Sequence, residues 1–283
     1  MILEGKSIVG ATSMSDSIEA ATRVGDVIIR HRPGVIEATL DRPQVINALN
    51  EGVVTGLEHA VALIEETDSI LLVLRGAGGN FCAGADLKYV STLFDDLEKD
   101  LFAYIQRLRS ICDVLANGPF ISLAVIEGYA LAGGYEILTA CDLAVATTTA
   151  AIGDRHLEYA LAPGLGASVR VAHHLSSKQA RYLAFTGEMI TGAQAAAWGL
   201  VSHAWDEDVF EQKTAALIAR LASRSPAAVR SYKRMLLAGE RSSFEEALGF
   251  EERAYRDYQR AFSESREGVA RFTAGSDRRG KAP

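Results

Sequence analysis

The stretch from residue 121 to residue 142 constrains the fold most, because an apolar run there passes through a glycine pair into a helical pattern. The run ISLAVI at 121–126 precedes Gly133 and Gly134, and Glu136 follows in the first helical turn. This order predicts a buried strand, a tight turn and a helix N-terminus. Glycines let backbone N–H groups approach a ligand closely, and the positive end of the helix favours negative charge. The turn is therefore a candidate site for a developing oxyanion.

A second unit of the same kind lies earlier in the chain. The apolar run 70–74 leads through a glycine-rich loop to Gly84 and Ala85, and Asp86 is a candidate N-cap of the next helix. Either loop alone is explained equally well by backbone geometry. Together they could supply two convergent N–H donors, as an oxyanion hole requires. Neither loop matches the dinucleotide or P-loop fingerprint, so the pair favours carbonyl activation over binding of nucleotide phosphates.

The order of the remaining segments predicts an α/β fold. Short apolar strands alternate with amphipathic helices up to about residue 200, which is typical of βαβ units with strands buried on both faces. After Ser177 the pattern becomes almost wholly helical. We therefore predict an N-terminal tail at 1–26, an α/β core at 27–200, a helical region at 201–272 and a polar tail at 273–283.

Charge and apolar patterning exclude several partner classes. The formal net charge of −7 provides no overall basic field, so we expect no nucleic-acid partner. The sequence has no apolar run of the length of a membrane span and no basic, apolar leader at its start, so we expect a cytoplasmic protein without a membrane partner. Cys82, Cys112 and Cys141 lie in apolar contexts without metal-ligand spacing, which indicates buried thiols in a reducing compartment.

The candidate acid–base residues are Glu136 and His156. Glu136 lies close to any ligand bound at the glycine turn, although a first-turn Glu is also favoured by the helix dipole alone. His156 lies in the polar segment GDRH beside Asp154, whose carboxylate could orient the imidazole ring. A single loop histidine is also typical of a protein surface. The other histidines form no ligand set with Cys, Asp or Glu, so we expect no metal.

Six segments, taken in order and spacing, resemble the crotonase superfamily of enoyl-CoA hydratases and isomerases. The resemblance runs from about residue 27 to about residue 272. The segments are RPQVINALN (42–50), GNFCAGADL (79–87), EGYALAGGYEILTACDLAVAT (127–147), PGLGAS (163–168), TGEMITGAQAAAWGLVSH (186–203) and SPAAVRSYKRML (225–236).

This resemblance implies a spiral core of stacked ββα units and a C-terminal helical region used for assembly as a trimer or a dimer of trimers. It also implies an acyl-coenzyme A thioester as substrate, with no separate cofactor. By position, the N–H groups of Ala85 and Gly133 form the oxyanion hole and Gly134 supports the turn. The loop of Ala83, Gly84, Ala85 and Asp86 would lie against the adenine end of coenzyme A, and Leu87 and Gly134 would also bind the substrate.

The resemblance places Glu136 at the first of two catalytic glutamates and His156 at the second, where the family hydratases have another glutamate. Double-bond isomerases of the superfamily depend mainly on that second carboxylate, so its loss argues against simple isomerase chemistry. A histidine there is similar to that of carbon–carbon bond hydrolases acting on β-diketones, which also have an Asp where this chain has Leu165. Three functions stay open: an enoyl-CoA hydratase-like lyase using Glu136 and His156, a β-keto hydrolase using His156, and an inactive acyl-CoA-binding homologue.

Overall fold

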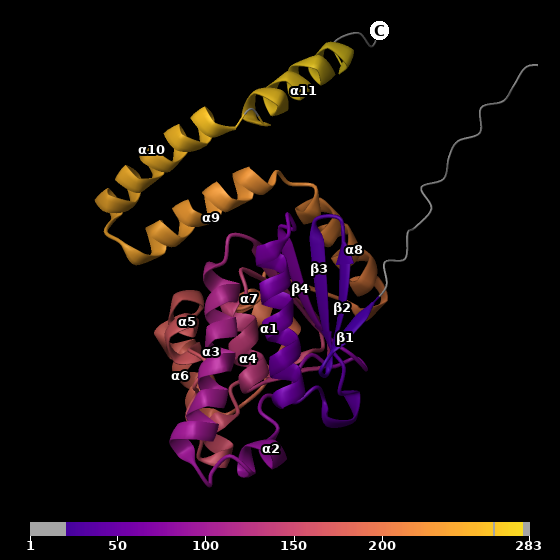
Figure 1. The fold of residues 1–283 in the computed structure, drawn as a ribbon, viewed down its shortest axis with the longest axis vertical. Coiled ribbons are helices and arrows are strands. Elements are labelled where there is room, and N and C mark those ends of the chain that lie inside the picture. The colour runs from indigo at the N-terminus through magenta and orange to yellow at the C-terminus, as the bar shows by residue number, and fades with distance from the viewer. Residues whose placement is uncertain (1–20, 263, 280–283) are drawn as a thin grey trace, which may run out of the picture.

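The computed structural model describes residues 21–262 and 264–279, and its main element is a mixed β-sheet flanked by helices (Figure 1). Within the described ranges, the large sheet has the strand order β1-β2-β3-β4-β5-β7-β10, and a smaller sheet has the order β6-β8-β9. The strands are β1 (Thr22–Val24), β2 (Val27–Arg32), β3 (Val35–Leu40), β4 (Leu71–Gly76), β5 (Ile121–Ile126), β6 (Tyr129–Leu131), β7 (Leu143–Thr147), β8 (Ala151–Gly153), β9 (Ile190–Thr191) and β10 (His203–Trp205).

The helices follow the strands in alternation through the core and then dominate the C-terminal part of the chain. They are α1 (Glu51–Glu66), α2 (Leu87–Ser91), α3 (Phe102–Asn117), α4 (Gly133–Ala140), α5 (Ala167–His174), α6 (Ser177–Thr186), α7 (Gly192–Trp198), α8 (Glu207–Ala222), α9 (Pro226–Arg241), α10 (Phe244–Ala261) and α11 (Glu264–Arg279). Short helical turns of other types lie at Pro43–Val45, Leu97–Leu101 and His156–Tyr159. The predicted α/β class is confirmed.

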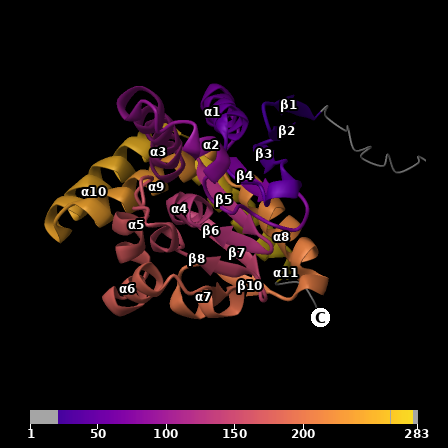
Figure 2. The same cartoon turned by 90° about the horizontal axis from the view of Figure 1, so that it is seen from below.

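The central strands are buried on both faces because each alternates two sets of apolar side chains. Residues such as Leu72, Leu74 and Ala124 face a large core shared with α1, α3 and α4. Their neighbours Val73 and Leu123 face a second, smaller core on the other side of the sheet, which α8 covers with Phe210, Leu217 and Ile218. Figure 2 shows the sheet between these two helical layers. Strands β3, β4, β5, β7 and β10 run parallel, so their carboxyl ends share one edge of the sheet.

The small sheet connects the glycine turn before α4 to the segment that contains His156. β6 pairs in parallel with β8, so Leu131 stands opposite Gly153. One residue later, the Ala132 N–H donates to the Gly153 carbonyl over 3.1 Å. The glycine turn before α4 and the segment that begins after Gly153 are therefore fixed against each other by backbone hydrogen bonds.

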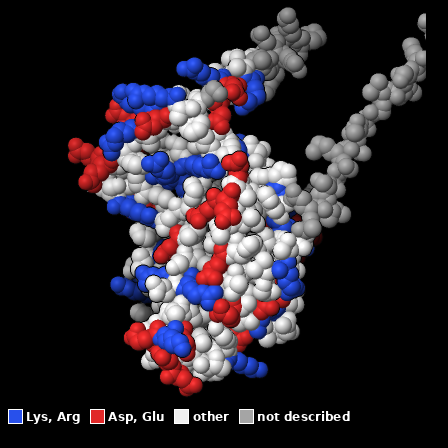
Figure 3. Space-filling model, in the orientation of Figure 1, with Lys and Arg blue, Asp and Glu red and all other residues white. Residues whose placement is uncertain are grey.

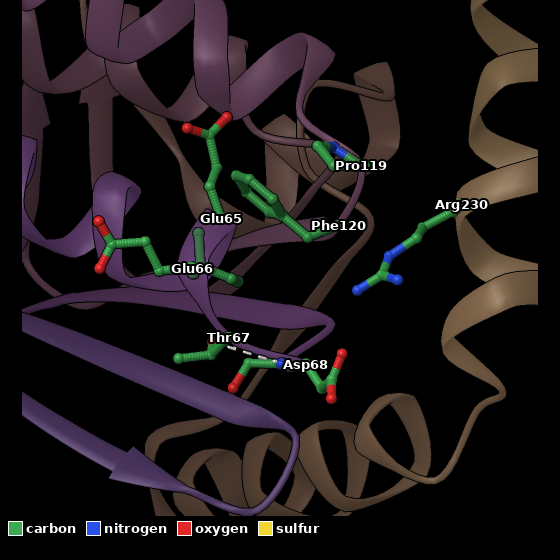
Figure 4. A pocket seen from close by; sticks show the side chains of 9 residues that line it. Glu65, Glu66, Thr67, Asp68, Pro119, Phe120 and Arg230 are labelled. Atoms are coloured by element: carbon green, nitrogen blue, oxygen red, sulfur yellow. Dashed lines mark hydrogen bonds between the residues drawn. The ribbon is translucent and has the colours of Figure 1, made fainter.

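The C-terminal helices lie across one end of the core, with α9 and α10 packed as an antiparallel pair (Figure 1). Lys233 joins α9 to the core: its Nζ donates to the Phe120 carbonyl over 2.8 Å and pairs with Asp142 Oδ2 at 2.8 Å. A groove of about 860 Å³ runs between α9 and the helices α3, α4 and α5. A second hollow of about 420 Å³ lies between the end of α1 and α9, and Arg230 points into it from α9 (Figure 4).

The structure places three segments differently from the predicted boundaries. Residues 22–24, assigned to the N-terminal tail, form β1 because they pair with β2 in an antiparallel ladder; residues 1–20 of that tail lie outside the described residues. β10 and α8 pack on the sheet although they follow residue 200. At the other end, α11 extends to Arg279, into the segment predicted as a polar tail, whose last residues, 280–283, are not described. None of the helices in the described ranges combines the length and apolar character that crossing a membrane requires.

Candidate active site

The two glycine loops meet in the folded chain. Gly84 has a φ of +94°, which favours glycine, and a Cβ built on it would lie 2.9 Å from the Gly133 nitrogen and 2.8 Å from the Ala132 Cβ. Ala132 itself has φ 46° and ψ −115°, a strained conformation for a residue with a side chain. This conformation makes a sharp turn between β6 and α4, so α4 begins at Gly133, directly beside Gly84.

The backbone nitrogens of Ala85 and Gly133 lie near each other at this contact. A Cβ added to Gly133 would lie 3.5 Å from the Ala85 nitrogen and 2.9 Å from Leu49 Cδ1. Within residues 21–262 and 264–279, neither N–H donates to a protein acceptor. Two free donors at a helix N-terminus can stabilise an oxyanion on a bound carbonyl.

The segment 42–50 holds the Ala85 loop in place. The Leu49 N–H donates to the Gly84 carbonyl and the Asp86 N–H donates back to the Leu49 carbonyl, each over 2.8 Å. Arg42 pairs with Asp86 Oδ2 at 2.9 Å. Asn47, fully buried, donates through Nδ2 to the carbonyls of Asn80 and Ala77. These supporting residues were missed by the sequence reasoning, because their partners lie 30 or more residues away.

Glu136 lies one turn into α4 and is buried, with 1% of its surface exposed. Its Oε1 accepts from the Leu165 N–H at 2.8 Å and from the Ala167 N–H at 3.3 Å, at the start of α5. These hydrogen bonds replace the ones to water that the carboxylate loses when it is buried. Its other oxygen, Oε2, lies 3.3 Å from His156 Nε2.

His156 is buried too, rather than at the surface. Its Nδ1 lies 2.6 Å from Asp154 Oδ1, and the same oxygen accepts the backbone N–H of His156 over 3.2 Å. The imidazole therefore stands between Asp154 and Glu136. Asp154, the carboxylate beside His156 in the sequence, therefore contacts this ring. At the position where the β-diketone hydrolases have an Asp, this chain has Leu165, which is 2% exposed.

The electrostatics of this cluster favour the protonated imidazole. Burial by itself would lower the pKa of His156, but the hydrogen bonds to Asp154 and Glu136, together with their charges, outweigh burial and raise the pKa to about 9. His156 is therefore an imidazolium near neutral pH. The buried thiols behave in the opposite manner: burial raises the pKa of Cys82 and Cys112 to about 12, so both stay protonated.

The other predicted binding residues lie around the Ala85 loop. Gly134 packs so closely that a Cβ there would lie 2.4 Å from the Cys82 carbonyl oxygen. The Ala83 N–H donates to the Ile46 carbonyl, and Leu87 is 41% exposed at the start of α2. The Asp86 carboxylate is engaged within the protein, since Oδ1 caps α2 and Oδ2 pairs with Arg42. Contact of this loop with substrate stays a prediction.

Metal ligands and disulfides are not features of the described residues. No group of three or more His, Cys, Asp or Glu side chains in the described ranges could hold a metal ion. The three cysteines are free and buried, as predicted. On the face shown in Figure 3, acidic and basic side chains are interspersed, and the absence of a nucleic-acid partner stays a prediction.

Comparison with known proteins shows what the chain is similar to. A family model described as Enoyl-CoA hydratase/isomerase matches residues 30–277. The bovine mitochondrial enoyl-CoA hydratase domain-containing protein 2 is 36% identical over 206 residues, which cover 71% of this chain and 69% of that protein. The Bacillus subtilis protein YngF, named for the same family, is 33% identical over 242 residues, covering 82% of this chain and 92% of that protein.

Solved structures give the same answer for the fold. The crystal structure of an enoyl-CoA hydratase from Bacillus anthracis superimposes with a TM-score of 0.83 at 27% identity, covering 88% of this chain and 96% of that one. The predicted crotonase-like core with a C-terminal helical region is thereby confirmed.

Proposed function

Because the chain belongs to the enoyl-CoA hydratase/isomerase family, we propose that it adds water to the double bond of an enoyl-CoA thioester, as a hydratase-type lyase. The family membership supports an acyl-CoA-processing enzyme of the crotonase type. The observation that carries the finer proposal is the 3.3 Å contact between Glu136 and His156, in a site that also contains two free backbone N–H groups.

In this proposal the thioester oxygen accepts hydrogen bonds from the N–H groups of Ala85 and Gly133. Addition of a nucleophile at the β-carbon moves negative charge onto that oxygen, so donors already in place stabilise the transition state more than the ground state. α4 carries both Gly133 and, one turn later, Glu136. The oxyanion donor and the carboxylate therefore keep a fixed relation to the bound substrate.

The acid and the base differ in charge. Glu136, held by the N–H groups of Leu165 and Ala167, serves as the general base that takes a proton from water. His156, protonated near neutral pH, serves as the acid that delivers a proton to the α-carbon. This assignment retains two acid–base groups although the second glutamate is absent.

The alternatives are less well supported by the site. A β-keto hydrolase that uses His156 to activate water needs a neutral imidazole nitrogen as acceptor, whereas both ring nitrogens here face carboxylate oxygens. An inactive binding homologue would have no need for a buried Glu136 beside two free N–H donors. We retain both as outcomes of the test below.

We further propose that α9–α11 assemble the chain into a homotrimer or a dimer of trimers. Large apolar side chains on these helices are exposed, such as Tyr232 at 65% and Phe244 at 82%. None of the eighteen residues of α10 is buried, although the helix has apolar and polar faces. Sedimentation of the purified chain would test this: a trimer or hexamer supports the proposal, and a monomer at micromolar concentration contradicts it.

We propose the cytoplasm as the location, in keeping with three reduced thiols. For the reaction, the decisive assay is mass spectrometry of an acyl-CoA panel before and after incubation with the protein. Gain of one water by enoyl-CoA substrates supports hydration. Cleavage of a β-ketoacyl-CoA or a cyclic β-diketone would support the hydrolase instead, and tight binding without any change in mass would support the inactive homologue.

A further inference from the structure

The histidine that replaces the second family glutamate does not stand alone, because a buried carboxylate contacts its far side. Asp154, 7% exposed, lies two residues before His156 and contacts Nδ1, whereas Glu136 contacts Nε2. We propose that Asp154 is a positioning residue for His156: it holds the imidazole doubly protonated, with Nε2 in ion-pair contact with Glu136. The catalytic part of this inference rests on the proposed function, whereas the contacts between Asp154 and His156 do not depend on it.

The hydrogen-bonding capacity of the three groups supports the doubly protonated ring. An ionised carboxylate accepts hydrogen bonds and donates none, whereas a neutral imidazole has one donor and one acceptor nitrogen. With carboxylate oxygens at 2.6 Å from Nδ1 and 3.3 Å from Nε2, a neutral ring would direct a lone pair at one of them. A second ring proton removes this repulsion: it makes the Nδ1 contact a charge-assisted hydrogen bond and the Nε2 contact an ion pair.

The backbone fixes Asp154 in the required place. Asp154 follows the last residue of β8, Gly153, whose carbonyl accepts the Ala132 N–H beside the oxyanion turn. Its Oδ1 then accepts both the backbone N–H and the ring nitrogen of His156. The Asp-x-His spacing closes a local turn in which the carboxylate and the imidazole orient each other.

The other ionisable groups nearby do not compete for this role. Burial, followed by the charges of Asp154 and Glu136, raises the pKa of Tyr135 on α4, and burial raises that of Cys112 on α3 to about 12. Both are uncharged near neutral pH. Arg155 is paired with Glu158. Arg170 on α5 donates to the Leu165 carbonyl and pairs with Asp113.

The arrangement gives a closed proton cycle for hydration. Glu136 takes a proton from water as the oxygen bonds to the β-carbon, and the electrons of the double bond move onto the thioester. His156 Nε2–H protonates the α-carbon, which leaves Glu136 protonated and His156 neutral. The proton on Glu136 then returns to His156 Nε2 across the contact that the structure shows, and both groups regain their starting charge.

Asp154→Asn tests the proposal, because asparagine keeps an oxygen for the Nδ1–H and loses only the charge. The first readout is the NMR titration of the His156 ring, assigned by its absence in His156→Gln. We expect its pKa to fall by about 1 pH unit or more, the effect of losing an adjacent opposite charge. Glu158→Gln is the matched control, since it removes a carboxylate two residues after His156 that pairs with Arg155 instead.

The second readout is turnover of an enoyl-CoA against pH. In Asp154→Asn the alkaline decline of kcat should move to lower pH by the same interval as the NMR titration, and activity should recover in part at pH about 6. Asp154→Glu, which restores the charge, should restore the pKa of His156 in part. If Asp154→Asn does not fold, the titration of Asp154→Glu against wild type and Glu158→Gln still measures the coupling.

An unchanged His156 titration in a folded Asp154→Asn would overturn the proposal. The two proposals fail separately. If the wild-type protein hydrates no enoyl-CoA, the proposed function fails, whereas the role of Asp154 is still decided by the NMR titration.

Discussion

The two halves of the candidate site consist of different chemical groups. The oxyanion half consists of backbone N–H groups, at Ala85 and Gly133, held by turns that leave no room for larger residues. The acid–base half consists of buried side chains, Asp154, His156 and Glu136, linked through one imidazole ring. Backbone N–H groups do not titrate between pH 5 and pH 10, whereas the His156 imidazole, with a pKa of about 9, does. If the proposed function holds, the backbone half activates the carbonyl and the side-chain half transfers protons, so pH should act on the second half alone.

The largest effect should come from Glu136→Gln, which removes the proposed general base from the acid–base half. The substitution keeps the shape, but the amide cannot take a proton from water, so we expect kcat to fall by about 10³–10⁴. Steady-state hydration of crotonyl-CoA measures it, with thermal unfolding as the check on folding. A fall of less than tenfold in a folded variant would remove Glu136 from its proposed role.

Gly133→Ala should break the oxyanion half while leaving the protein folded. The new methyl group would lie 3.5 Å from the Ala85 nitrogen and would displace the end of the Leu49 side chain, 2.9 Å away. Filling the hole should lower kcat by about 10²–10³, the usual effect of losing one such donor.

Gly134→Ala is the matched control for that substitution. Its methyl group would lie 2.4 Å from the Cys82 carbonyl oxygen, which is backbone and cannot easily move. It should therefore lower the free energy of unfolding more than Gly133→Ala does. Equal loss of activity and stability in both variants would mean that Gly133 is needed only for packing.

The acid–base half should also contribute a pH-dependent term to stability. Because the pKa of His156 is about 9 in the folded protein and 6.5 for an ordinary imidazole, the contribution is complete below pH 6.5 and is lost as pH rises through 9. This separation corresponds to about 3 kcal/mol. The difference in free energy of unfolding between wild type and His156→Gln, from urea titrations, should therefore shrink by that amount between pH 6 and pH 9.5. A difference that stays constant would contradict a protonated His156.

The smallest effect should come from Asp86→Asn, which changes one of the residues that hold the Ala85 loop in place. Asparagine can still cap α2, but the ion pair with Arg42 is lost, so unfolding should become easier by about 1 kcal/mol. Turnover should change only a few-fold, because the Leu49 hydrogen bonds still hold the loop. Glu252→Gln is the control, since its pair with Arg256 on α10 is exposed and should contribute less. A hundredfold loss of turnover in Asp86→Asn would instead indicate direct contact with substrate.

Local patterns were enough to predict much of the fold and the position of the two loops. Apolar runs located β4 and β5, and Asp86 caps α2, as expected of a side-chain oxygen at that position. The sequence could also place Asp154 close to His156, because only Arg155 separates them. β10 forms by pairing with β7, far earlier in the chain, and hydrophobic periodicity does not predict such a pairing.

The rest of the site depends on contacts that sequence spacing does not encode. Glu136 is held by Leu165 and Ala167, about thirty residues further on, through backbone groups that any residue would offer. Burial of Glu136 and His156 comes from the whole of α4 lying inside the core. The raised pKa of His156 requires carboxylates on both sides of a buried ring. Only the folded chain shows this arrangement.

The pH dependence of hydration by the unmodified protein tests the central claim most directly, because it reports whether His156 acts with or without its second proton. Measured as kcat from pH 5 to pH 10, the rate should hold through neutral pH and decline as pH rises through about 9, where the imidazolium loses its proton. A rate that instead climbs between pH 7 and pH 9, as a neutral imidazole acting as the base would require, would contradict the account.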